Sequence, residues 1–287
     1  MGRIRVVTDS ACDIPQAEVE RYGITIVPLV VVFGEEEYPD RLLSPEEYWT
    51  KAARVHPQTS QPSPGAFAAA YRPIVEAGDD VFCITITGKH SGTYSTALAA
   101  AAEFPPGRVT VFDSLSLSQG QGVQVVEAAR LAEEGASAEE IVRHLQELQR
   151  RIHIFILLDT LEYLERGGRA AALMPVVKRV AQALSIKPIL NLVEGELKLV
   201  SAARSYERGL SRLVQEAVAR APWESAGVLH ALAPQAAEAV ADRLAQETGF
   251  PRASILVMET GSVLSSHGGP RVLGVITVTR RPPQATG

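Results

Sequence analysis

Short apolar segments rich in β-branched residues alternate with predicted helices along the first half of this sequence, and this alternation constrains the fold more than any other feature. The segments have the length and composition of buried strands and cover residues 3–7, 24–33, 81–86, 108–112 and 152–158. Strands connected through helices form right-handed crossovers and pair in parallel. The sequence therefore predicts an N-terminal α/β domain with a parallel sheet flanked by helices.

Helix starts in this half are marked by serine caps. Ser44 is followed by Pro45 and Glu47, and Ser137 is followed by Glu140. A serine whose hydroxyl accepts from a helix amide, with a glutamate three residues later, is a capping box, and proline fits the first helical position. Helices are accordingly predicted to start after each of these serines.

The pattern changes in the second half of the chain. Residues 186–204 contain two apolar runs about Glu194-Gly195, which predicts a β-hairpin. An amphipathic helix is expected over 206–221, and further strands and a helix follow. Hairpins belong to antiparallel sheets, so this part is predicted to form a mixed or antiparallel sheet.

We therefore expect two domains. With 287 residues, of which 46% are hydrophobic, the chain is long enough for two cores. The change of pattern divides it into an N-terminal α/β domain over 1–160 and a C-terminal α/β domain over 161–287. A ligand cleft is expected between them.

Composition excludes several classes of protein. The formal net charge of −5, without a dense basic block, argues against nucleic acid as a partner. Cys12 and Cys83 stand alone, so neither a disulfide framework nor a zinc site is indicated. The sequence lacks a signal-peptide core and any apolar run of the roughly 20 residues that a transmembrane helix needs, so we expect a cytoplasmic protein. Neither phosphate-loop nor dinucleotide-binding glycine motifs are present, and no bound nucleotide is expected.

Hydroxyl-rich turns follow three of the predicted strands. They are Thr8-Asp9-Ser10, the turn around Ser91, and residues 113–118, and the loop 59–61 could join them. Ligands of parallel α/β sheets bind at the carboxyl ends of the strands, where these turns meet. Ser91 also precedes a predicted helix whose first amides favour an anion. These turns predict an anion site, although serine and threonine can also act there only as helix caps.

One histidine has a comparable setting in the second half. His267 lies between Ser266 and two glycines, on a predicted loop between two strands. An imidazole on such a loop could lie beside an anion in the cleft. The alternative is that His267 is exposed or hydrogen-bonded to backbone.

Six motifs, in this order, resemble the DegV family of bacterial fatty-acid-binding proteins: VTDSACDIP, TSQPSPG, HSGTYSTA, DSLSLSQGQG, LEYLERGGR and GSVLSSHGGPRVLG. The resemblance implies a two-domain α/β fold that holds one long-chain fatty acid between the domains. It further implies that the acid is delivered to an ATP-dependent fatty acid kinase, which makes the acyl phosphate used in phospholipid synthesis. The protein itself would be a carrier without catalytic residues, cofactor or metal.

The resemblance also assigns residues. Thr59, Ser91 and His267 match the positions that hold the fatty-acid carboxyl group, and Gly92 would add its backbone amide. Arg204 resembles a surface arginine associated with kinase docking, although a solvated arginine at a helix start is the alternative. Four further residues are possible supports: Ser10, Ser60, Thr93 and Ser118.

Two other functions stay open at the level of sequence. A hydrolase could use Ser91 as nucleophile, His267 as base and Asp113 or Asp9 as orienter, although no G-x-S-x-G elbow is present. A sensor or regulator could bind a phosphorylated sugar or a small acid at the same helix start. An apolar tunnel would separate these functions, and its wall could include residues 171–184, which are equally typical of a core helix.

Overall fold

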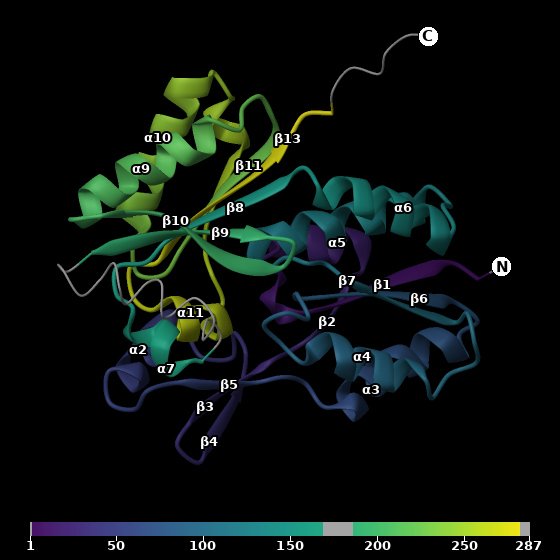
Figure 1. Ribbon diagram of the computed structural model, residues 1–287. Helices are drawn as coiled ribbons and strands as arrows, with labels where there is room; N and C mark the ends of the chain where they lie inside the picture. Colours follow the sequence, from purple (N-terminus) through teal and green to yellow (C-terminus); the bar gives the residue numbers. More distant parts are fainter. Residues whose placement is uncertain (1, 169–185, 282–287) are drawn as a thin grey trace, which may run out of the picture.

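The computed structural model describes residues 2–168 and 186–281, and in this part of the chain helices flank a four-stranded, a six-stranded and a three-stranded sheet (Figure 1). The four-stranded sheet has the order β2-β1-β6-β7 and all its pairings are parallel. Its strands are β1 (Ile4–Asp9), β2 (Thr25–Val27), β6 (Asp80–Thr85) and β7 (Val109–Asp113). The predicted N-terminal parallel sheet is thus confirmed.

Helices cover both faces of this sheet. Residues of α3 (Pro64–Glu76) and α4 (Thr93–Ala101) pack on the face that includes Cys83. The opposite face includes Phe82 and packs against α5 (Ser118–Glu133) and α6 (Ala138–Gln149), with α1 (Gln16–Tyr22) beside α5. Neighbouring residues of a strand point to opposite faces, so a continuous apolar run such as β6 fills two cores.

The six-stranded sheet has the order β10-β9-β8-β13-β11-β12. Its strands are β8 (Ile152–Leu157), β9 (Lys187–Val193), β10 (Glu196–Ala203), β11 (Trp223–His230), β12 (Ile255–Glu259) and β13 (Leu273–Thr279). Only β11 and β12 pair in parallel. The predicted mixed sheet and the hairpin about Glu194 and Gly195, both at positive φ, are confirmed.

One strand lies in a different sheet from the one that the sequence predicts. Residues 152–158 were expected to complete the parallel sheet, but β8 pairs antiparallel with β9 and β13 in the six-stranded sheet. An apolar run carries no information about its partners, and these partners follow β8 in the chain. By sheet membership the second unit starts with β8, whereas the domain boundary near residue 160 stays a prediction.

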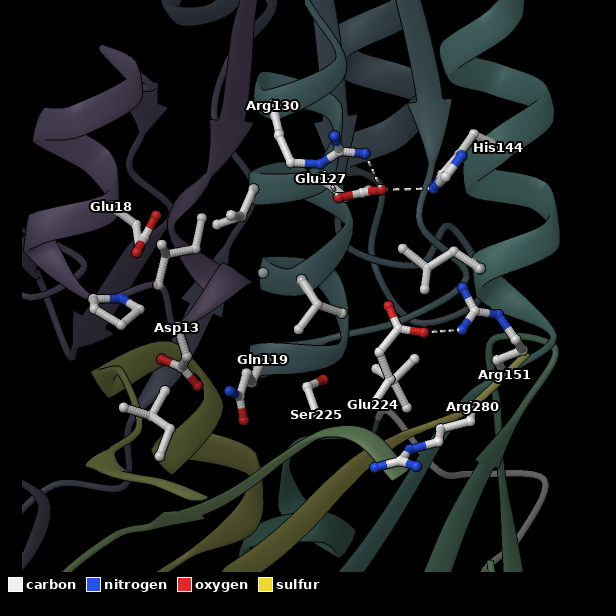
Figure 2. Close-up of a pocket in the computed structure, with 18 of the residues that line it drawn as sticks. Asp13, Glu18, Gln119, Glu127, Arg130, His144, Arg151, Glu224, Ser225 and Arg280 are labelled. Atoms are coloured by element: carbon white, nitrogen blue, oxygen red, sulfur yellow. Dashed lines mark hydrogen bonds and ion pairs between the residues drawn. The ribbon is translucent and has the colours of Figure 1, made fainter. Parts of the chain in front are cut away.

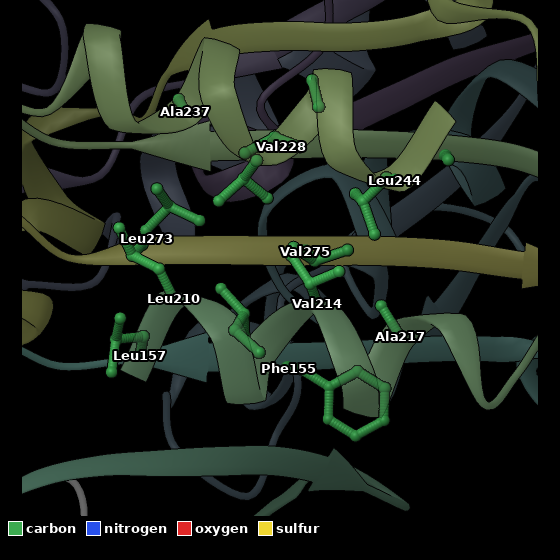
Figure 3. Packing of buried hydrophobic residues seen from close by; sticks show 14 of the residues in the cluster. Phe155, Leu157, Leu210, Val214, Ala217, Val228, Ala237, Leu244, Leu273 and Val275 are labelled. Atoms are coloured by element: carbon green, nitrogen blue, oxygen red, sulfur yellow. The ribbon is translucent and has the colours of Figure 1, made fainter. Parts of the chain in front are cut away.

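One face of the six-stranded sheet is covered by two helices, α9 (Tyr206–Val218) and α10 (Pro234–Thr248). Figure 3 shows Phe155, Val228 and Val275 of the sheet packed with Val214 and Leu244 of these helices. The aliphatic face of α9 predicted from the sequence is therefore a core face. The opposite face of the sheet points toward the N-terminal unit, where α5 contacts β8, β11 and β13.

The small sheet has the order β4-β3-β5. It consists of β3 (Val30–Phe33), β4 (Glu36–Pro39) and β5 (Gln58–Ser60), all antiparallel. The predicted segment 24–33 is therefore two strands, β2 and β3, which belong to different sheets. Pro28 lies between them and lacks the amide that a continuous ladder needs.

Short helices complete the described chain. They are η1 (Ser10–Cys12), α2 (Pro45–Ala52), α7 (Glu162–Arg166), η2 (Arg252–Ser254) and α11 (Ser262–Gly268). The capping boxes at Ser44 and Ser137 are confirmed. In the two described ranges, no helix combines the length and the apolarity required to cross a membrane.

Candidate functional site

We call Thr59, Ser91 and His267 the anchors, because they are the residues predicted to hold the carboxyl group. Two of them, from distant motifs, meet in the structure. β5 carries Thr59 and α11 carries His267, and the Oγ1 atom of Thr59 lies 2.8 Å from Nε2 of His267. The expectation that His267 lies on a loop is wrong, since it is the penultimate residue of helix α11. Glycines and serines made this helix hard to recognise from the sequence. The imidazole also packs closely on Gly167, where an ideal Cβ would lie 2.4 Å from Nδ1 of His267.

Ser91 lies in the turn between β6 and α4, where its hydroxyl is held by Thr93. The Oγ atom of Ser91 accepts the Thr93 amide at 3.3 Å and lies 2.7 Å from Oγ1 of Thr93. If Thr93 donates its hydroxyl proton as well, the proton of Ser91 is left for a ligand. Ser91 therefore satisfies the start of α4 and can still donate.

Thr59, Ser91 and His267 line one cavity of about 70 Å³, which we call the polar cavity. Ser60, Gln61 and His90 are among its other polar lining residues. The three anchors predicted from sequence therefore come together. They do so at the carboxyl end of the parallel sheet, where α4 starts.

Gly92 is covered by the side chain of Gln61, which belongs to the loop 59–61 that was expected to join the turns. An ideal Cβ at Gly92 would lie 1.9 Å from Oε1 of Gln61, and Nε2 of Gln61 donates to Oγ1 of Thr96 at 2.7 Å. The carboxamide of Gln61 thus fixes β5 to the start of α4. Gly92 is the N-cap residue of α4, and only a residue without a side chain leaves room for Gln61.

The supporting residues predicted from sequence have mainly structural partners. Ser10 donates to Asp40 at 2.7 Å and Ser118 donates to Asp13 at 2.6 Å, and both serines are buried. Ser60 lines the polar cavity, but its hydroxyl donates to the neighbouring carbonyl oxygen of Gln61 at 3.3 Å. Ser60 and Thr93 therefore lie next to the anchors, Ser118 lines the neighbouring cavity that His267 also lines, and Ser10 lines neither cavity.

Two buried carboxylates fix the start of α11 to the N-terminal unit. Asp13 accepts the Gly261 amide at 3.0 Å and the Thr260 hydroxyl at 2.6 Å. Asp40 accepts the Val263 amide at 3.0 Å. Carboxylates are favoured at a helix N-terminus, and these bonds set the position of the helix that ends in His267. No sequence signal could identify these two carboxylates, because their partners lie 223 to 248 residues further along the chain.

The proposed orienters of a hydrolase hold loops. Asp9 accepts the Ile86 amide at 2.7 Å and the Ala11 amide at 3.0 Å, and burial raises its pKa to about 6. Asp113 accepts amides of Gly88 and Leu115. Both carboxylates thereby shape the turns around the polar cavity.

Burial also raises the pKa of the Cys12 thiol far above its usual range, which disfavours a thiolate nucleophile.

A second cavity, of about 100 Å³, adjoins the polar cavity, and we call it the apolar cavity. The two share Leu117, Leu164, Leu197, Leu264 and His267 as lining residues. Most of the rest of its lining is aliphatic and comes largely from the open face of the six-stranded sheet: Ile154, Ile156, Leu158, Leu190, Leu229, Val272, Gly274 and Ile276. Ser118, Thr260 and Gly268 complete the lining. The predicted tunnel wall over 171–184 lies outside the described residues.

Another cavity, of about 780 Å³, lies elsewhere, beside α5 and β11. Figure 2 shows two groups of paired charged side chains in this cavity. Arg130 and His144 contact Glu127 at 2.8 and 2.7 Å, and Arg151 contacts Glu224 at 2.5 Å. None of the predicted site residues lines this cavity.

Arg204 is exposed in the connection between β10 and α9, next to Ser205, which caps α9. It lines neither the polar nor the apolar cavity. Arg204 therefore lies outside both cavities, and its assignment to kinase docking stays a prediction.

Known proteins are similar to this chain over nearly its whole length. A protein from Thermus thermophilus, described as a fatty acid binding DegV family protein, is 35% identical and has a TM-score of 0.88, with 97% of this chain and 100% of that one covered. The fatty acid binding protein DegV from Bacillus subtilis is 29% identical, with a TM-score of 0.85 and the same coverage.

Curated relatives match this chain over nearly their whole length. A DegV domain-containing protein of Streptomyces coelicolor is 34% identical over 284 residues, with 96% of this chain and 99% of the relative covered. One of Caldanaerobacter subterraneus is 32% identical over 281 residues, with 96% and 98% covered. The family described as "Uncharacterised protein, DegV family" matches residues 3–280. This chain therefore belongs to the DegV family.

Proposed function

We propose that this protein is a carrier that binds one long-chain fatty acid between its two units and presents the carboxyl group to an ATP-dependent fatty acid kinase for acyl-phosphate formation. One observation carries the proposal: a small cavity lined by Thr59, Ser91 and His267 adjoins an aliphatic cavity and shares lining residues with it. A polar end and an apolar end match the two parts of a fatty acid. The fatty acid binding described for the T. thermophilus and B. subtilis relatives supports it.

The polar cavity offers donors for a carboxylate. When Nε2 of His267 donates to Oγ1 of Thr59, the Thr59 hydroxyl proton is left to donate to one carboxylate oxygen. Ser91, whose oxygen accepts from Thr93, can donate to the other. The N-terminal end of α4, including the amide of Gly92, adds a favourable potential. These donors offset the desolvation of the carboxylate and fix its orientation.

The apolar cavity supplies the affinity. Each methylene group that leaves water contributes about 0.8 kcal/mol, so a long acyl chain gains more from burial than its head group gains from hydrogen bonds. A small phosphorylated anion would leave the apolar cavity unfilled. The adjoining aliphatic lining therefore favours a fatty acid over the small-anion regulator.

A carrier role fits the residues at the head. Thr59, Ser91 and His267 act as donors and need no cofactor or metal, and the phosphoryl transfer would belong to the kinase. Arg204, exposed away from both cavities, is the residue that we propose for kinase contact. The acyl phosphate would then enter phospholipid synthesis in the cytoplasm.

The test begins with protein purified without detergent from a cell that makes fatty acids. Denaturing extraction followed by mass spectrometry should recover close to one fatty acid per chain. The delipidated protein is then reloaded, mixed with a DegV-partner kinase and ATP, and assayed for acyl phosphate. Binding without phosphorylation would leave a fatty-acid-binding protein and contradict the kinase step. An empty protein that cannot be reloaded would contradict the whole proposal.

A further inference from the structure

Gly274 occupies the middle of a row of residues across the open face of the six-stranded sheet. In the strand pairings Leu190 faces Ile156, Ile156 faces Gly274, and Gly274 faces Leu229, on the neighbouring strands β9, β8, β13 and β11. All four residues line the apolar cavity. Three of them carry large aliphatic side chains, so the row has one gap, at Gly274.

A side chain at Gly274 would point into the apolar cavity. Its neighbours Leu273 and Val275 belong to the core under α9 and α10, on the other face of the sheet. Ile276, two residues on, lines the apolar cavity. Since alternate residues of a strand share a face, position 274 faces the cavity too.

Neither the backbone nor the packing of the protein requires glycine there. The φ angle of Gly274 is not in the left-handed region. An ideal Cβ would have only two neighbouring heavy atoms within 4 Å, Cδ1 of Ile276 at 3.7 Å and the carbonyl oxygen of Phe155 at 3.8 Å, which is ordinary contact. A methyl group would therefore fit against the protein itself.

The other buried glycines of helices and strands in the described chain differ in this respect. An ideal Cβ would lie 2.3 Å from a neighbouring atom at Gly120, 2.4 Å at Gly122, 2.6 Å at Gly209 and 1.7 Å at Gly227. Those glycines are explained by close packing of the protein. Glycine in the interior of a strand weakens the strand, and it often marks a bulge, a bend or the close approach of a ligand or of another backbone. The pairings of β13 show no register shift at Gly274, so close approach of a ligand is the reason that fits.

We infer that Gly274 is a specificity-determining residue: the space beside it admits the wider acyl tails, those bent by a cis double bond or carrying a methyl branch, as well as straight saturated tails. The inference rests on the proposed function. Straight chains fit a narrow channel, whereas a bend or a branch needs extra width at one place. The sheet face that lines the apolar cavity forms the floor of this cavity, and the gap in the row at Gly274 makes the cavity wider in the middle of the floor.

The experiment is a competition. Delipidated wild-type protein and the Gly274→Ala variant are each incubated with an equimolar mixture of palmitic, oleic and a methyl-branched C17 acid, and the bound acids are extracted and quantified by mass spectrometry. The added methyl group should lower the ratio of oleic and branched acid to palmitic acid about tenfold, the usual effect of one methyl group in a hydrophobic pocket. Thr277→Val is the matched control, because Thr277 lies on the same strand with its side chain on the other face.

A second variant acts in the opposite direction and covers the case in which Gly274→Ala fails to fold. Ile276→Val removes a methyl group from the same face of β13 and should raise the proportion of bent and branched acids. Unchanged ratios in a folded Gly274→Ala protein, or in Ile276→Val when the first variant is unfolded, would overturn the inference and leave fatty acid binding intact. A wild-type protein that takes up none of the three acids would overturn the proposed function and this inference with it.

Discussion

Thr59 and His267, 208 residues apart in the sequence, are joined by a hydrogen bond of 2.8 Å between Oγ1 and Nε2. Thr59 belongs to the small sheet of the N-terminal unit and His267 to a helix between strands of the six-stranded sheet. The two residues line the polar cavity from different units, and the bond between them joins the units at this cavity. Any change that separates the units also takes the two donors apart.

Replacing Thr59 by valine should weaken fatty acid binding and leave the fold intact. The shape of the side chain is kept, but the donor to the carboxylate is lost, which costs about 1.5 kcal/mol or more and thus about tenfold in Kd. Titration of delipidated Thr59→Val with a fluorescent fatty acid checks this. Thr50→Val, on the exposed side of α2, is the control, and equal affinity in the two variants would remove Thr59 from the site.

Asp9 should make stability depend on pH between about pH 4 and pH 6. Burial raises its pKa to about 6, above the value of about 3.9 in an unfolded chain. The folded protein then holds the proton more tightly, so the contribution of Asp9 is full below about pH 4 and is lost as the pH rises through about 6. The lost stability is on the order of 3 kcal/mol.

Urea unfolding of the wild type and of Asp9→Asn across this range measures that contribution, because the titration of the other carboxylates cancels in the difference. The advantage of the wild type should shrink as the pH rises from about 4 to about 7. Parallel curves for the two proteins would show that Asp9 titrates as in an unfolded chain.

Gly92 and Gln61 should be energetically coupled. The Gly92→Ala methyl group would displace the Gln61 carboxamide, whose bond to Thr96 is worth about 1 kcal/mol. Gln61→Ala loses the same bond, so adding Gly92→Ala to it should cost little more. A double-mutant cycle from urea unfolding should give a coupling energy of about 1 kcal/mol. Additive effects would mean that Gln61 already lies elsewhere in solution.

Arg204→Ala should slow the kinase reaction without changing fatty acid affinity. The guanidinium is exposed and lines neither cavity, so its loss leaves the binding site unaltered. The initial rate of acyl-phosphate formation at low carrier concentration checks this, with Arg208→Ala, an exposed arginine on the first turn of α9, as control. Equal rates for the two variants would assign kinase docking to another surface.

Local signals in the sequence were reliable predictors of structure. The capping boxes at Ser44 and Ser137 and the hairpin about Glu194 and Gly195 depend on neighbouring residues and were confirmed. The sheet that contains β8 depends on pairing with strands elsewhere in the chain, and the prediction for it was wrong.

The site shows the same division. Motifs identified Thr59, Ser91 and His267, which the structure brings to one cavity. The roles of Asp13 and Asp40 were not predicted, because the local sequence around an acidic residue in a turn does not indicate a buried partner on another unit. The loop 59–61 was expected to join the turns, but the role of Gln61 within it could not be predicted, since it depends on the space above Gly92.

The position of β13 between β8 and β11 has a consequence for biosynthesis. While the ribosome is still translating, the parallel sheet can already fold, but β8 and β11 have no strand to join them until the nascent chain extends past Thr279. The floor of the apolar cavity, and the helix that presents His267 above it, are thus assembled last. Under the proposed function, a nascent chain could take up a fatty acid only after translation of this segment is finished.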